Sequence, residues 1–163
     1  MVTQKIIEAF NTQIKLELES AYIYLAMAAY FHDQNLDGMA QWMRVQAQEE
    51  QTHAMKFFDH LVDRGARVEL QTISQPKSSW NSPLEVFEEA YQHEMFVTGK
   101  INDLVKLATA EDDYPGLALL QWFVTEQVEE EASTSKVAQQ LKMLGSSGSG
   151  LVMFDRQLGK REE

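Results

Sequence analysis

Apolar residues recur at helical spacing through most of the chain. Within residues 3–30 they return at alternating steps of four and three, and no proline interrupts the run. A second run covers about 36–64 and stops at Gly65, a residue typical of the position after a helix. A third starts after the capping residue and proline of 81–83, and a fourth follows the segment EDDYPG. Each run exceeds about twice the average globular helix, so the pattern predicts four long amphipathic helices.

The connections between these runs predict their topology. The first and second helices, and likewise the third and fourth, are joined by short polar segments typical of antiparallel hairpins. Segment 65–83 is much longer and can reach ~60 Å when extended, whereas a helix of this size spans only ~40 Å. It can therefore return along the whole bundle and start the third helix parallel to the second. We expect an all-α four-helix bundle with one long crossover.

The C-terminal part departs from this pattern. The glycine and serine residues of 145–150 predict a flexible turn, although their composition also matches an engineered linker. Apolar positions in 151–160 predict a short fifth helix, and the charged ending KREE is expected to be a solvated tail. The expected organisation is one domain over 1–163, with the bundle in 3–144.

Polar residues interrupt all four apolar seams near the middle of their helices. They should therefore lie at one level of the bundle, whichever direction each helix runs. Aromatic residues close by, namely Tyr24, Tyr91 and Trp122, are interpreted as bundle core. The interrupting residues are Glu17, Glu50, His53, Glu94, Gln127 and Glu130.

Buried carboxylates without partners are too costly to persist, so this layer needs cations or protons. Lysine and arginine are absent from the seams, which favours metal ions. Glu50 and His53 are three residues apart and can bind the same ion, and Gln127 and Glu130 repeat that spacing. Carboxylates with a single imidazole suit iron(II) or manganese(II), although zinc would also bind. Two ions sharing Glu50 would lie ~3.5–4 Å apart. Any one of these glutamates taken alone would instead be interpreted as solvated surface.

Composition and charge narrow the function further. The net charge of −11 argues against nucleic acid as a partner, because phosphate binding needs clustered lysine and arginine. The absence of cysteine excludes disulfides, thiolate metal sites and thiol nucleophiles. No stretch has the length or apolarity of a secretory signal or a membrane span. We expect a cytoplasmic protein that contacts neither nucleic acid nor membrane.

Several segments carry a resemblance to a known family over essentially the whole chain. They are LELESAYIYLAMA around Glu17, WMRVQAQEEQTHAMKFFD around Glu50 and His53, YQHEMF around Glu94, and LQWFVTEQVEEEAS around Glu130. Together they resemble the prokaryotic non-haem ferritins.

The resemblance implies a ferroxidase centre that oxidises Fe(II) with dioxygen or peroxide. It implies Glu17, Glu50 and His53 on one iron, Glu50, Glu94 and Glu130 on the other, Gln127 close by, and Tyr24 beside the centre. A third iron site is implied at Glu49, Glu126 and Glu129, positions that periodicity alone assigns to a charged surface. The family also implies a homo-oligomeric shell of twenty-four chains that stores ferric mineral, with the short C-terminal helix at the four-fold axis.

Departures from relatives of that family restrict the cofactors. Bacterioferritins have a second Glu-x-x-His pair and a haem-ligating methionine, and this chain has Glu130 and Gln51 at those positions, so haem is not expected. Rubrerythrins need cysteine, which is absent. Two other functions are considered from the residues: a di-iron or di-manganese oxidoreductase acting on an organic substrate, and a non-catalytic helical assembly protein with solvated glutamates.

Overall fold

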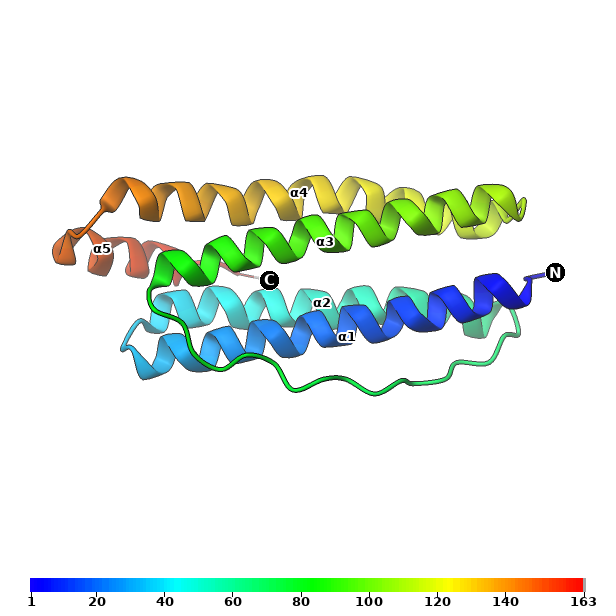
Figure 1. Cartoon of the computed structure of the whole chain (residues 1–163), viewed down its shortest axis with the longest axis horizontal. Helices are drawn as coiled ribbons and strands as arrows, with labels where there is room; N and C mark the ends of the chain where they lie inside the picture. The colour runs from blue at the N-terminus through cyan, green and yellow to red at the C-terminus, as the bar shows by residue number, and fades with distance from the viewer. Residues whose placement is uncertain (163) are drawn as a thin grey trace.

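The computed structural model describes residues 1–162 and folds them into five helices (Figure 1). One antiparallel pair is formed by α1 and α2, a second by α3 and α4, and the two pairs pack together as a bundle. The predicted all-α bundle with a fifth short helix is confirmed. The helices are α1 Gln4–Asp33, α2 Asp37–Asp63, α3 Pro83–Ala110, α4 Tyr114–Leu144 and α5 Gly148–Leu158.

The long connection between α2 and α3 runs the length of the bundle, so α3 starts at the same end as α2 (Figure 1). Buried Asn11 on α1 anchors this crossover. Its Nδ2 donates to the carbonyl of Arg67 at 3.0 Å, and its Oδ1 accepts from the amide of Glu69 at 2.8 Å. Nearer α3, the indole of Trp80 is buried in the core. The predicted return along the bundle is therefore observed, and side chains fix its path.

Local capping explains where the long helices begin and end. The hydroxyl of Thr3 accepts from the amide of Ile6 at the start of α1, and Ser82 caps α3 in the same way. Gly65 has φ of 69°, the left-handed conformation that ends α2 at low cost. The helix α4 begins inside EDDYPG and not after it, because proline is tolerated in a first turn, where its missing amide has no helical partner.

The fifth helix starts earlier than the sequence predicted. It begins at Gly148, inside the glycine and serine segment, and ends at Leu158 where 151–160 was expected. The hydroxyl of Ser147 accepts from the amide of Gly150 at 3.1 Å, and this cap offsets the weak helix propensity of the glycines. Asp155 then joins α5 to α2 by accepting from the amide of Met39 at 2.8 Å.

The hydrophobic core is split into two clusters along the bundle. The cluster nearer α5 includes Phe31 and Phe87, and the other includes Phe10 and Phe123. On every long helix the six polar seam residues fall between the two clusters, so a polar layer crosses the middle of the core. Within residues 1–162, no helix has the length and apolarity required to cross a membrane.

Candidate metal centre

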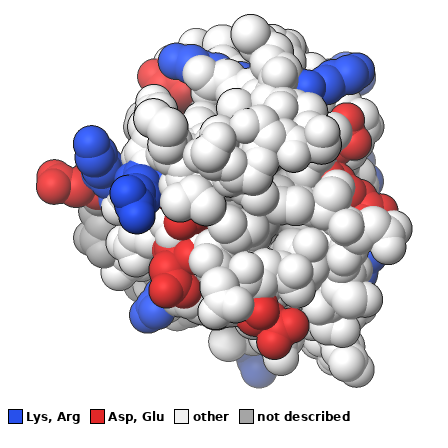
Figure 2. All heavy atoms as spheres, turned by 90° about the vertical axis from the view of Figure 1, so that its left-hand side faces the viewer, with Lys and Arg blue, Asp and Glu red and all other residues white. Residues whose placement is uncertain are grey.

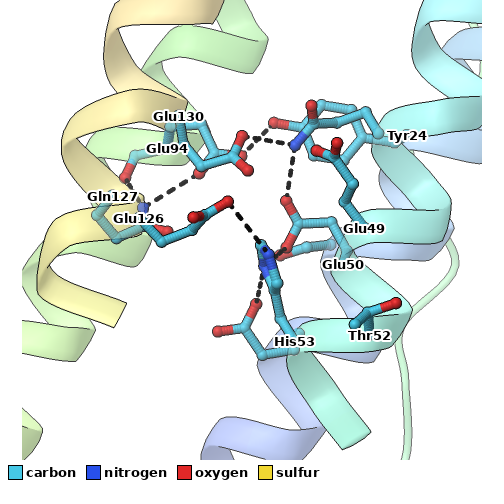
Figure 3. Close-up of polar contacts among 12 residues, drawn as sticks. Tyr24, Glu49, Glu50, Thr52, His53, Glu94, Glu126, Gln127 and Glu130 are labelled. Atoms are coloured by element: carbon cyan, nitrogen blue, oxygen red, sulfur yellow. Dashed lines mark hydrogen bonds and ion pairs between the residues drawn. The ribbon is translucent and has the colours of Figure 1, made fainter. Parts of the chain in front are cut away.

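The six polar seam residues are brought together from all four long helices. Each exposes at most 4% of its surface, and the side chains of Glu50, His53, Glu94, Gln127 and Glu130 point toward one another between the two helix pairs (Figure 3). They form the single layer that the seams predicted. Glu17 comes from α1, Glu50 and His53 from α2, Glu94 from α3, and Gln127 and Glu130 from α4.

One group of donor atoms is formed by Glu17, Glu50 and His53. One ligand atom from each lies within 4.8 Å of the other two. His53 Nδ1 is 3.2 Å from Glu50 Oε2 and 3.9 Å from Glu17 Oε2. Among the described residues, Glu17 Oε2 is a buried oxygen without a hydrogen-bond partner. A cation between these three side chains would satisfy that oxygen.

A second group consists of Glu50, Glu94 and Glu130, again with donor atoms within 4.8 Å of one another. The Tyr24 hydroxyl donates to Glu94 Oε1, and Gln127 Nε2 donates to Glu94 Oε2 at 3.1 Å. Gln127 therefore contributes a hydrogen-bond donor to the layer. Glu50 belongs to both groups, the position that a bridging ligand requires.

Gln46 is a member of the layer to which the sequence reasoning gave no role. Its Nε2 donates to Glu50 Oε1 at 3.0 Å and to Glu130 Oε2 at 2.7 Å, so one amide ties α2 to α4. Gln46 is fully buried one turn before Glu50 in the same seam. A polar residue at a seam position was the signal that could have identified it.

Burial and mutual repulsion raise the pKa values of carboxyl groups in the layer. Desolvation raises the pKa of Glu17 and of Glu50 well above the ordinary value, and neighbouring carboxylates raise both further. Burial, followed by the charge of Glu94, raises the pKa of Glu130 to about 8. Without cations, burial and repulsion therefore favour the protonated form of these carboxyl groups. Metal ions binding here would replace those protons.

The three residues of the implied third site are not all gathered in the structure. Glu126 Oε1 lies 3.7 Å from His53 Nε2, and Glu126 forms a third donor group with His53 and Glu130. Over residues 1–162, Glu49 and Glu129 belong to no such group. Glu129 is exposed, and the carboxylate of Glu49 pairs with a residue from the C-terminal tail.

That residue is Arg161, in the tail that the sequence assigned to solvent. Its Nη2 lies 2.9 Å from Glu49 Oε2, and its side chain is only 19% exposed. The prediction of a solvated tail is wrong at this residue, because its long side chain packs on α2. Nothing in the local pattern of KREE signals a contact with a helix more than a hundred residues earlier.

Trp122 also differs from its predicted place in the core. It is 39% exposed, and its ring makes a T-shaped contact with the His53 imidazole at a centroid distance of 5.4 Å. Lys56 Nζ lies 4.2 Å from the centre of the indole ring. Trp122, Lys56 and Glu126 border a depression in the surface that reaches His53. On this side of the bundle, the surface depression therefore extends to a residue of the buried layer.

The chain matches one family and many of its members over nearly its whole length. The ferritin-like domain family matches residues 7–144. The bacterial non-heme ferritin of Escherichia coli O157:H7 is 39% identical over 158 residues, covering 97% of this chain and 96% of that protein. That of Bacteroides fragilis strain YCH46 is 38% identical over 161 residues, covering 99% and 100%.

Solved structures give the same result. An open pore ferritin from the hyperthermophilic archaeon Archaeoglobus fulgidus is 46% identical, with a TM-score of 0.98 over 99% of this chain and 100% of that chain. A humanized archaeal ferritin is also 46% identical, with a TM-score of 0.99 over 100% of both. The buried carboxylate layer, the crossover and these matches agree: the chain belongs to the ferritin family and is a relative of the bacterial non-haem ferritins.

Proposed function

We propose that this chain stores iron and is a ferroxidase, oxidising Fe(II) to Fe(III) at the carboxylate layer. The observation that carries the proposal is the position of Glu50, which is shared by two donor groups at the centre of the bundle. Two ferrous ions held there would be bridged by Glu50 and completed by His53 and Glu17 on one side and by Glu94 and Glu130 on the other. Hard carboxylate oxygens suit the Fe(III) product.

The chemistry follows from this arrangement. Each ferrous ion loses one electron, and one dioxygen that accepts two electrons and two protons becomes hydrogen peroxide. Peroxide can serve as the oxidant in turn. The chain's own contribution is to hold two substrate ions in a dry layer and to keep the carboxylates in place through Gln46, Tyr24 and Gln127. Haem has no part in this scheme.

A third cation is proposed beside Glu126, which already lies near His53 and Glu130. Participation of Glu49 and Glu129, the other residues of that site, requires side-chain movements that would bring them to Glu126. Trp122 and the depression next to it connect this position with the surface. We propose that iron leaves or reaches the layer on this side.

We further propose that the chain assembles into a shell of twenty-four copies that holds the ferric mineral. Figure 2 shows the end of the molecule where α5 lies, with charged side chains mainly around the edge and few in the middle. Val152 and Met153 on α5 are exposed, as is Met143 near the end of α4. Burying such residues between copies removes apolar surface from water. Electron microscopy of the purified protein would test the closed shell, and small discrete oligomers would contradict it.

The enzymatic part is tested by anaerobic addition of Fe(II) followed by oxygen, with rapid formation of a diferric species as the expected result. Glu50→Ala and His53→Ala should slow oxidation by at least about a hundredfold, because each removes a ligand of the reacting pair. Glu88→Gln is the matched control, since it removes a carboxylate from the exposed surface of α3. Oxidation by Glu50→Ala at the parent rate would place the chemistry elsewhere.

A further inference from the structure

Arg161 makes four contacts with α2 from the segment after α5. Its Nη1 donates to the carbonyl of Trp42 at 3.2 Å, and its Nη2 donates to Gln46 Oε1 and to Glu49 Oε2, both at 2.9 Å. The guanidinium also lies over the Trp42 indole, with its carbon 4.2 Å from the ring centre. A side chain with planar geometry, a charge partner and an aromatic face is held in one position.

This position is next to the third donor group of the layer. Glu49 adjoins Glu50 in sequence, and the charges of Glu49 and Glu129 both act on Glu126. A third cation held beside Glu126 would therefore be attracted by the carboxylate of Glu49. Arginine keeps its positive charge at any accessible pH, so its guanidinium competes with such a cation for the same carboxylate.

We propose that Arg161 is a positioning residue that holds Glu49 away from the third donor group, so that a cation binding there must take Glu49 from the guanidinium. The inference rests on the proposed function, because it takes the carboxylate layer to bind divalent cations. In this proposal the C-terminal tail limits how readily a cation occupies the third position. It also links α5, at the end of the bundle, to metal binding in the middle.

A role limited to anchoring α5 predicts a different result. The helix has anchors of its own in Phe154 and Leu158, which are buried, and in Asp155, which accepts from the amides at the start of α2. Loss of an anchor would loosen the tail and leave the third cation unchanged or weaker. Loss of a competitor would make that cation bind more tightly. The sign of the change separates the two roles.

The experiment is a titration of the assembled protein with Co²⁺, which binds without turnover and reports its coordination by its visible absorption. The parent is compared with Arg161→Gln and with Lys160→Gln, which removes the same charge from an exposed neighbour. We expect the third cobalt ion per chain to bind about fivefold more tightly in Arg161→Gln, the upper range for a solvent-accessible charge pair. Lys160→Gln should bind it as the parent does.

Glu49→Gln completes a double-mutant cycle. In that background Arg161→Gln should give no further gain, because the carboxylate over which the guanidinium competes is gone. An unchanged or weaker third ion in Arg161→Gln would overturn the inference, as would saturation of both proteins at two ions. A gain that persists without the Glu49 carboxylate would also overturn it. Parent-like cobalt binding by Glu50→Ala would contradict the proposed function instead.

Discussion

The Tyr24 hydroxyl donates a hydrogen bond to Glu94 Oε1 and thereby joins α1 to α3 inside the polar layer. Both residues are at most 1% exposed, and Gln127 occupies the other oxygen of Glu94 from α4. Glu94 is therefore held from two helices at once. Its carboxylate stays aimed at Glu50 and Glu130 without a charged partner from the protein.

Tyr24→Phe should slow iron oxidation by about tenfold and lower the free energy of unfolding by about 1–2 kcal/mol. The change leaves a buried carboxylate oxygen without its donor, which costs both alignment and stability. Stopped-flow oxidation and thermal unfolding provide the two measurements. Tyr114→Phe is the control, because that tyrosine is 71% exposed. Equal rates for the Tyr24 variant and the control would show that the hydrogen bond does not position Glu94 for oxidation.

Glu50→Gln should separate stability from activity. Burial, together with the charges of Glu94 and Glu130, raises the pKa of Glu50, so the ionised side chain is unfavourable when no cation is present. An amide of the same shape has no charge to bury, and the metal-free variant should be more stable than the parent by about 1–3 kcal/mol at pH 8. The rate of Fe(II) oxidation by this variant should nevertheless fall sharply. Calorimetry of chelator-treated protein checks the first expectation; a less stable variant would contradict it.

The metal-free protein should lose stability as the pH rises from about 4.5 to about 8. Glu130 titrates at about 8 in the folded chain and near 4.5 when unfolded, so in this window the folded chain holds a proton that the unfolded chain has lost. The contribution is fully present below 4.5 and disappears as the pH passes 8. Divalent cations should restore the unfolding temperature more at pH 8 than at pH 5.

Unfolding scans at several pH values, with and without Zn²⁺, provide the measurement for this pH dependence. Glu130→Gln is the matched variant, because it removes the titrating group and keeps the shape of the side chain. Its metal-free stability should depend less on pH over the same range. A parent protein that gains stability between pH 5 and pH 8 without metal would show that the layer is ionised in the folded chain.

The pair formed by Arg64 and Asp113 fastens the end of α2 to the start of α4. Two hydrogen bonds of 2.9 and 2.5 Å join them, and Asp113 is 6% exposed. Arg64→Met should cost about 2–4 kcal/mol, since it leaves a buried carboxylate unpaired. Arg67→Met is the control, because its pair with Glu69 is largely exposed and should contribute less than about 1 kcal/mol. Similar losses in the two variants, measured by urea unfolding, would contradict this assignment.

Gly38→Ala should undock α5 from α2. An added Cβ at Gly38 would lie 1.8 Å from the carbonyl oxygen of Asp155, so one of the two helices has to move. Amide hydrogen exchange across 148–158 should rise by at least about tenfold, while exchange in α1 stays as in the parent. At Gly99 the corresponding Cβ meets nothing within 4 Å, and Gly99→Ala is the control. Protected amides in α5 of the Gly38 variant would rule out the close contact.

The sequence alone determined the four-helix bundle and most of the residues of the polar layer at its middle. Helical periodicity, the caps at Thr3 and Ser82 and the left-handed Gly65 are local features, and they account for the start of α1, the start of α3 and the end of α2. The polar layer could also be predicted from the sequence, because a carboxylate at a seam position conflicts with burial wherever it occurs along the helix. Four such conflicts at one level predict that the carboxylates share cations or protons.

The tertiary structure decided the features that depend on contacts between distant segments. Gln46 acquires its role only where α2 meets α4, and Arg161 reaches Glu49 from a tail whose composition is typical of solvent. Trp122 lies on the same helix as Gln127 and Glu130, but the packing leaves it partly open beside His53. Periodicity reports which face of a helix is buried. It does not identify the partner that covers that face, and such partners determine how this carboxylate layer is held.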